Sequence, residues 1–285
     1  MNQCKTLLKK EWWINWKQLL LPVWVSLAFI GVCIIGLLIG LIKGKTITYF
    51  RMEGNFPPEF SNLFLFGSVQ TLNIALGFLS IMVAIMLADN LINGGFKLKC
   101  EILHQSQPVS LTKMLSSKYV FLILGSFIVF AVISFIGTLI ITFTQMYFTY
   151  AVFYFGFYAW LQCTVEMLFT LIFVCSLFWF FACLYQNKSF FMGIITLVGI
   201  ELAIKLLNYT SGLDLPSLLG YLSKFIKISS NPGFGNAMDL KVKTLADIVQ
   251  ANWQNVININ TLLKLLYSVI LTLGGSVLYK RRELI

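Results

Sequence analysis

Residues 119–185 read YVFLILGSFIVFAVISFIGTLIITFTQMYFTYAVFYFGFYAWLQCTVEMLFTLIFVCSLFWFFACLY, and Glu166 is the only charged residue among these 67. A helix needs about 20 apolar residues to cross a hydrocarbon core of about 30 Å. The stretch is too long for one crossing and fits two crossings with a tight connection. Its middle, residues 142–160, is crowded with Tyr and Trp, as is typical of a turn at the level of the lipid headgroups. We therefore expect two membrane-spanning helices here.

The composition of the whole chain points to the same class of protein. Of its 285 residues, 58% are hydrophobic and only 11% are charged. Soluble domains carry roughly 25% charged residues, so this chain lacks the polar side chains that a water-facing surface needs. The composition therefore excludes a soluble globular enzyme and predicts an integral membrane protein.

Four further apolar stretches lie outside the central one. They are residues 20–42, 63–87, 190–207 and 261–279. The last contains Lys264, whose long side chain is expected to reach toward an interface. Together with the central pair, these stretches predict an all-α polytopic membrane protein with about six transmembrane helices.

The predicted spans divide the chain into four parts. Residues 1–18 form a cytoplasmic interfacial helix, residues 19–207 hold transmembrane helices one to five, and residues 89–118 form a cytoplasmic loop within that part. Residues 208–260 form an external segment before the last span, in which apolar residues at helical spacing between 215 and 226 predict a short helix with Asp214 as its N-cap. Residues 261–285 form the sixth helix and a basic cytoplasmic tail.

The distribution of basic residues orients these spans. With the N-terminus in the cytoplasm, the inside segments carry 12 Lys and Arg residues and the outside segments carry 7. Basic residues favour the cytoplasmic side, so we expect a multi-pass protein of the cell's inner (cytoplasmic) membrane with both termini cytoplasmic. The formal net charge of +10 then indicates anionic lipid, rather than nucleic acid, as the partner of the basic residues.

The first 18 residues have the pattern of an amphipathic helix. The pattern sets apolar side chains on one face and basic ones opposite, with Leu8, Trp12, Trp16 and Leu19 against Lys10 and Lys17. Such a helix lies in the plane of the membrane interface. We expect it on the inner leaflet, leading into the first span.

No motif for catalysis or for direct cofactor binding stands out. The chain has one histidine, His104, and none of its six cysteines forms a C-x-x-C pair. Residues 44–46 read GKT, but the first glycine of a phosphate-binding loop would fall at Ile39. We expect no catalytic residue, no metal site and no directly bound cofactor.

The loop of residues 89–118 carries the most informative pattern outside the spans. Gly94 and Gly95 are expected to end the second span, and a short charged helix follows with Phe96, Cys100 and Leu103 on one face. Pro108 then stops this helix, and Ser110 is placed to cap the next one. The pattern fits either an amphipathic helix that docks into a groove of a soluble partner or an ordinary interfacial loop.

The order of these parts resembles a known family of transporters. A basic N-terminal amphipathic helix, two spans, a loop reading EILHQSQPVS at residues 101–110 and four more spans resemble the ABC-2 type exporter permeases. Residues 1–17, with LLKKE at positions 7–11, also resemble the opening of that family. Two features depart from its usual pattern: the spacing from Glu101 to Pro108 is one residue longer, and residues 208–260 exceed the usual short hairpin.

The resemblance implies a function and partners. The chain would be the membrane-spanning permease subunit of an ABC exporter, paired with a second permease copy as a homo- or heterodimer. It would bind two copies of a separate ABC ATPase subunit, which alone would bind ATP and Mg and hydrolyse the nucleotide. The positions implied to couple to that ATPase are Phe96, Lys97, Lys99, Glu101, Leu103, Pro108, Val109 and Ser110.

Other function classes stay open at this point. One is a polytopic membrane scaffold or assembly factor without a transport path. Another is a secondary transporter, which would need inverted repeats or charges at the midplane of the membrane, and the sequence has no convincing repeat.

Three ionisable residues fall inside predicted spans. Glu201 and Lys205 are four residues apart on one helix, in the favourable order for an ion pair. Glu166 has no base within four residues, so we expect its carboxyl to face the protein interior, where it lines a path or bonds to a neighbouring helix. Both carboxyls also fit a purely structural role.

Overall fold

The computed structural model describes residues 2–42, 58–97, 110–144, 150–185, 188–212, 214–226, 253 and 256–282. Over these residues all regular structure is helical, and no strand occurs among them. The helices are α1 (Asn2–Leu19), α2 (Leu21–Ile42), α3 (Pro58–Lys97), α5 (Leu111–Thr144), α6 (Tyr150–Leu184), α7 (Ser189–Ser211), α8 (Leu218–Ile226) and α10 (Ile259–Arg282). The expected all-α fold is confirmed.

Within the part of the chain that the structure describes, five helices are long and apolar enough to cross a membrane. Their spans are Leu65–Gly94, Leu111–Phe143, Gly156–Leu184, Ser189–Ser211 and Ile259–Arg281. The central apolar stretch is divided between α5 and α6, as expected. The chain is therefore a multi-pass membrane protein. Helix α2 is a further apolar helix of 22 residues, and the total of six crossings stays a prediction.

The second span is longer than the sequence indicates. The span on α3 reaches Gly94, whereas the helix itself has 40 residues and continues through Gly94 and Gly95 to Lys97, so the two glycines do not break the helix. A glycine in a helix costs only about 1 kcal/mol relative to alanine, and tertiary packing overrides such a preference. Residues 91–93 just before the glycines are buried in the bundle, and this packing holds the last turns of α3.

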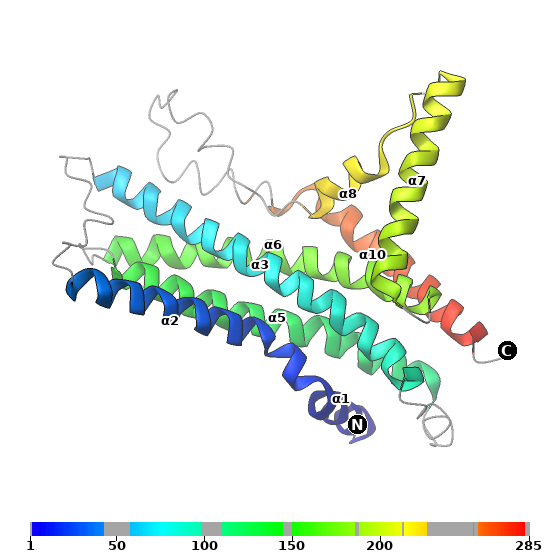
Figure 1. The fold of residues 1–285 in the computed structure, drawn as a ribbon, viewed down its shortest axis with the longest axis horizontal. Helices are drawn as coiled ribbons and strands as arrows, with labels where there is room; N and C mark the ends of the chain where they lie inside the picture. The colour runs from blue at the N-terminus through cyan, green and yellow to red at the C-terminus, as the bar shows by residue number, and fades with distance from the viewer. Residues whose placement is uncertain are drawn as a thin grey trace.

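The helices form a bundle with α1 at one end. Helices α2, α3, α5 and α6 run lengthwise beside one another, and α1 lies across one end of them (Figure 1). We call this the α1 end of the bundle. Helices α3, α6 and α10 finish there, and α5 and α7 begin there (Figure 1). The start of the chain and the end of α10 thus lie at the same end, as an even number of crossings requires.

Helix α6 is the centre of the packing, with α3 on one side and α10 on another. Trp179 of α6 is fully buried, and its ring meets Tyr119 of α5 edge to face with the centroids 5.3 Å apart. Gly275 lets α10 approach the α6 backbone closely, because a Cβ at this position would lie only 3.3 Å from the Cα of Phe180. Small residues permit such close helix contacts in membranes.

Helix α7 leaves the bundle at a steep angle and is braced by α8 (Figure 1). Phe225 of α8 packs on Phe173 of α6 and on Tyr267 of α10, with ring centroids 5.4 and 5.8 Å apart. The expected N-cap of this short helix, Asp214, is wrong. Ser217 stands directly before α8, and its Oγ accepts the backbone N–H of Gly220 at 3.0 Å.

The fold allows a direct test of the orientation expected from the basic residues. In a background whose six native cysteines are replaced by serine, Tyr209→Cys, at a site 92% exposed on α7, should react with an impermeant maleimide added to intact cells. Lys113→Cys, at an exposed site at the α1 end, should react only after the cells are opened. The reverse pattern of labelling would overturn the orientation.

Candidate functional site

Helix α1 turns a mixed polar and apolar face toward the bundle. Glu11 is 7% exposed, Asn15 3% and Leu19 1%. Asn15 Nδ2 donates to the backbone oxygen and to Oε2 of Glu11, at 3.2 Å each. The sequence placed Trp12 and Trp16 on one face with Leu19, but both indoles stay partly outside, at 45% and 36% exposure. The bundle therefore contacts a face that is rotated from the tryptophans and includes the carboxyl of Glu11.

Two hydrogen bonds between side-chain amides connect α1 to α3. Asn90 Nδ2 donates to Gln18 Oε1 at 3.0 Å and lies 3.5 Å from Asn15 Oδ1. Both acceptors belong to the second half of α1, close to the point where the chain turns into α2. The last turns of α3 are thus fixed to α1.

Lys118 connects α5 to the contact between α1 and α3. Its side chain is 8% exposed, and Nζ donates to the backbone oxygen of Leu91 at 2.6 Å. The ammonium also lies near enough to Glu11 to interact with its charge. A buried ammonium is expensive unless it is paired and hydrogen-bonded, and Leu91 and Glu11 supply these two functions. Lys118 therefore joins three helices, α1, α3 and α5.

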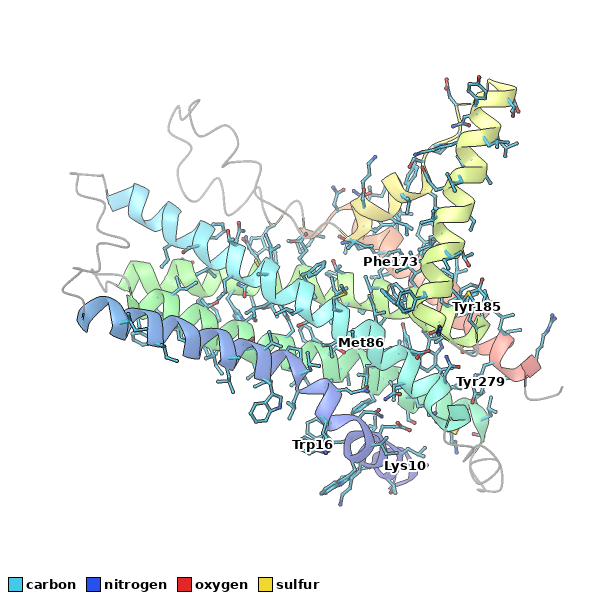
Figure 2. All side chains as sticks on the ribbon, viewed as in Figure 1. Lys10, Trp16, Met86, Phe173, Tyr185 and Tyr279 are labelled. Atoms are coloured by element: carbon cyan, nitrogen blue, oxygen red, sulfur yellow. The ribbon has the colours of Figure 1, made fainter. Side chains whose placement is uncertain are left out.

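A second group of bonds ties α3 to the connection between α6 and α7. Asn93 Nδ2 donates to Asp89 Oδ1 at 2.8 Å and to the backbone oxygen of Tyr185 at 3.2 Å. Ser189, the first residue of α7, donates its hydroxyl to the same Asp89 oxygen. Tyr185 marks the place where α6 gives way to α7 (Figure 2). The residues that form these two groups of bonds, which we call the polar latch, are Glu11, Asn15, Gln18, Asp89, Asn90, Asn93, Lys118 and Ser189.

Glu11 makes the polar latch sensitive to pH. Burial raises the pKa of the Glu11 carboxyl above its ordinary value of 4.5, against the smaller opposite effects of Lys118 and Lys10. A carboxyl whose pKa is raised by docking favours the docked state below its ordinary pKa and opposes it as the pH rises through the raised value.

We expect α1 to be held more tightly at acidic pH than at neutral pH. Protection of α1 amides from hydrogen exchange, corrected for the intrinsic rate, should fall as the pH rises from about 4.5 through the raised pKa of Glu11. Glu11→Gln should remove this dependence. A pH dependence that persists unchanged in Glu11→Gln would assign the effect to another group.

A second polar site lies within the spans, between α6 and α10. Lys264 of α10 is 5% exposed, and its Nζ donates to Thr170 Oγ1 at 3.1 Å. Thr170 is the midpoint of the span Gly156–Leu184. Glu166, one turn earlier on α6, interacts electrostatically with Lys264. The expectation that Lys264 reaches toward an interface is wrong: its ammonium turns inward and interacts with a carboxyl and a hydroxyl of the neighbouring helix.

Hydroxyl groups extend the α6–α10 contact toward the α1 end. Thr272 of α10 donates to Ser176 Oγ at 3.3 Å, and Ser176 Oγ lies 2.6 Å from the hydroxyl of Tyr119. Lys264, Ser268 and Thr272 follow one another at a spacing of four residues, so they form one stripe on the side of α10 that packs on α6. The contact is therefore polar along much of its length.

Glu201 serves a different purpose from the one its spacing indicates. Its ion pair with Lys205 is present, with Nζ 3.9 Å from Oε1, but Lys205 is largely exposed. The carboxylate also accepts the hydroxyl of Ser217 at 2.8 Å and the backbone N–H of Leu219 at 3.1 Å. A carboxylate in this position accepts hydrogen bonds from the free backbone N–H groups at the start of α8, and its negative charge interacts favourably with the helix dipole. Glu201 therefore fastens α8 to α7.

This contact gives a matched pair of substitutions. Glu201→Ala should release the start of α8 and raise hydrogen exchange of its amides, because the carboxylate accepts the hydroxyl of Ser217 and the backbone N–H of Leu219, and hydrogen bonds to a charged group are stronger than neutral ones. Lys205→Ala should change exchange little, because an exposed ion pair contributes about 0–1 kcal/mol. Equal effects of the two substitutions would show that the hydrogen bonds to α8 are not what holds it.

The structure describes only part of the sequence-predicted sites. Of the coupling positions, Phe96 and Lys97 belong to the last turn of α3, and Ser110 stands exposed directly before α5. The remaining coupling positions, Lys99, Glu101, Leu103, Pro108 and Val109, lie outside the described residues. In α1, Lys17 is exposed with its Nζ 5.9 Å from the ring centroid of Trp16, and Lys10 is half-buried.

Sequence reasoning missed the inward roles of Lys118, Lys264 and Glu11. The i, i+4 stripe of Lys264, Ser268 and Thr272 was a usable signal, because a polar stripe on an apolar helix faces protein rather than lipid. Lys118 and Glu11 left no comparable pattern. Among the described residues, no group of three or more His, Cys, Asp or Glu side chains is placed to hold a metal ion.

Comparisons with known proteins bring no further assignment. No protein family, curated protein or solved structure matches this chain.

Proposed function

We propose that this chain is the membrane-spanning permease subunit of an ABC exporter. It would form the translocation path, with a second permease copy, and would itself hydrolyse nothing. A separate ATPase subunit would bind ATP and Mg on the cytoplasmic side. The α1 end of the bundle would face that side.

The polar latch is the observation that supports this proposal best. The segment between α3 and α5, residues 98–109, carries most of the expected ATPase contacts, and the latch fixes the two helices that flank it. Asn90 joins α3 to α1 by a hydrogen bond, and Lys118 joins α5 to α3 by a hydrogen bond and to α1 by its charge interaction with Glu11. Asn93 and Asp89 join α3 to the connection between α6 and α7 and to the start of α7. A push on the segment would therefore move several helices together, as coupling to a bound ATPase requires.

The exposed charge supports the proposed orientation. Eight of the ten basic side chains that are described as exposed or half-buried lie at the α1 end, and only Lys205 and Lys224 lie elsewhere. The eight are Lys5, Lys9, Lys10, Lys17, Lys113, Lys188, Lys280 and Arg281. Basic residues near the ends of spans favour the cytoplasmic side.

The intramembrane site would serve the permease as a fixed contact between α6 and α10. A membrane-buried ion pair needs both partners, since either charge alone is costly in hydrocarbon. Lys264 and Glu166 would therefore keep the last span in one register on α6 while other helices move.

A membrane scaffold or assembly factor is the second candidate, and the surface of α7 favours it. Apolar side chains are exposed all along that helix, including Phe191, Ile195 and Leu202 at 61–63%. A helix packed so loosely on its own bundle has room for another membrane protein. In this case no ATPase would accompany the chain.

Purification of the tagged chain from the membranes of its own cell separates the two candidates. A permease should bring along an ATPase subunit that carries a phosphate-binding loop, and the complex should hydrolyse ATP. A scaffold should bring along other membrane proteins and no ATP turnover. Mild detergents and prior chemical cross-linking guard against loss of a weakly bound ATPase. Absence of any ATPase under both conditions would overturn the proposal.

A further inference from the structure

The outer surface of α1 combines aromatic and basic side chains. Trp12, Trp13 and Trp16 are 45%, 68% and 36% exposed, and Ile14 is 60% exposed. Lys5, Lys9 and Lys17 are exposed among them. Figure 2 shows Lys10 and Trp16 on this helix, at the margin of the bundle. A surface of this composition is typical of helices that lie in the headgroup region of a bilayer.

The outer surface of α1 carries positive charge without any negative charge. The only acid in α1 is Glu11, which is buried against the bundle beside Lys118. The other described acid of the α1 end, Asp89, is held by Asn93 and Ser189. Lys5, Lys9 and Lys17 thus have no exposed acid beside them in the part of the chain that the structure describes.

The position of α1 identifies the occupant of this surface. Helix α1 ends at Leu19 and the apolar helix α2 begins at Leu21, so a single residue separates them. The backbone N–H of Leu20 still donates to Trp16 at 2.9 Å, and this bond makes the junction tight. A helix so close to the start of an apolar span cannot lie deep in the cytoplasm. It must lie at the level of the lipid headgroups.

We propose that the outer face of α1 binds anionic phospholipid headgroups of the adjoining leaflet. The lysines supply the charge attraction, and the tryptophans anchor the helix at the headgroup level. Because the opposite face of α1 holds Glu11 and Asn15 of the polar latch, bound anionic lipid also stabilises the docking of α1 on the bundle. This proposal stands independently of the ATPase.

Lipid retention tests the proposal with matched charge removals. The full-length chain is purified in mild detergent from mixed phosphatidylglycerol and phosphatidylcholine vesicles, and its bound lipid is counted by mass spectrometry. Lys9→Gln with Lys17→Gln should lower the phosphatidylglycerol to phosphatidylcholine ratio at least fivefold, because one basic side chain near an anionic surface contributes a factor of about five. Lys205→Gln with Lys224→Gln, which removes the same charge away from α1, should leave the ratio unchanged.

Thermal unfolding in lipid nanodiscs separates lipid binding from a folding defect. The wild-type chain should unfold at a higher temperature in phosphatidylglycerol than in phosphatidylcholine, and the Lys9 and Lys17 double variant should lose that difference. In phosphatidylcholine both chains should unfold at the same temperature. An unchanged phosphatidylglycerol to phosphatidylcholine ratio in the Lys9 and Lys17 double variant would overturn the proposal. An equal fall of this ratio in the Lys205 and Lys224 double variant would overturn it too. Anionic lipid binding that needs only net charge would give the second result.

Discussion

Replacement of Lys264 by Met is expected to lower the free energy of unfolding by about 3–5 kcal/mol, the cost of leaving one of two interacting charges inside a protein without the other. The substitution leaves Glu166 without the charge that compensates it and leaves Thr170 without its donor. Glu166→Gln should destabilise the chain to a similar degree, because it removes the negative charge that interacts with the buried ammonium of Lys264.

The double variant Glu166→Gln with Lys264→Met should recover most of this loss. Replacement of a whole buried pair by uncharged residues of similar size is often neutral, and the difference between the double and single variants isolates the interaction. The measurement is denaturant unfolding in a mild detergent with the signal from intrinsic fluorescence. Lys224→Met, at an exposed site, is the control and should cost little. Additive losses in the double variant would contradict an ion pair between these residues.

Replacement of Glu101 and Leu103 by Ala is expected to abolish substrate-stimulated ATP turnover by the complex with the ATPase. The two residues lie in the segment between α3 and α5, and the resemblance to exporter permeases implies contact with the ATPase there. A short amphipathic segment docked in a groove depends on a few side chains for most of its binding energy. Turnover of the reconstituted complex is the measurement.

The control for this prediction removes two exposed polar groups just beyond the segment. Thr112→Ala with Ser116→Ala, at the start of α5, should leave turnover unchanged. Both double variants should insert into the membrane at the wild-type level, which is checked by the same labelling of Tyr209→Cys that tests the orientation. Normal ATP turnover in the variant with Glu101 and Leu103 replaced by Ala would contradict the assignment of these residues to ATPase coupling.

The spans were predictable because the bilayer constrains them by length and polarity alone. The expected division of residues 119–185 is present as α5 and α6, and residues 190–207 and 261–279 lie inside α7 and α10. A stretch of about 20 apolar residues has few other uses in a protein. The continuation of α3 past its glycines to Lys97 was missed because the buried packing of residues 91–93, which holds these turns, follows from the tertiary fold and not from a local pattern.

The partners of the polar side chains were less accessible from sequence. Helical spacing identified Glu201 and Lys205 as a pair, but Ser217 and Leu219, which come from beyond the turn after α7, are the closer partners. Lys264 and Glu166 are nearly 100 residues apart, so their meeting depends on which helices pack together. Periodicity within one helix identifies a face, whereas the neighbour of that face follows only from the tertiary fold.

The side of α1 that packs on the bundle was likewise only partly predictable from the sequence. Leu8 and Leu19 pack on the bundle as their pattern indicates, whereas Trp12 and Trp16 lie toward the outside. A helix at an interface has two surroundings of low polarity, the protein and the lipid. Hydrophobicity alone does not decide which side chain meets which of them, and the buried Glu11 and Asn15 decide it here.

Photo-cross-linking from residue 103 distinguishes an exporter permease from a membrane protein that has no ATPase partner. A photoreactive amino acid replaces Leu103 in the full-length chain, and cells are illuminated before lysis, so that a weakly bound partner is captured in place. The proposal predicts a covalent adduct with an ATPase subunit from this position and none from the same group at Tyr209, which is exposed on α7. Adducts from position 103 with lipid or other membrane proteins alone, or an ATPase adduct from Tyr209, would contradict it.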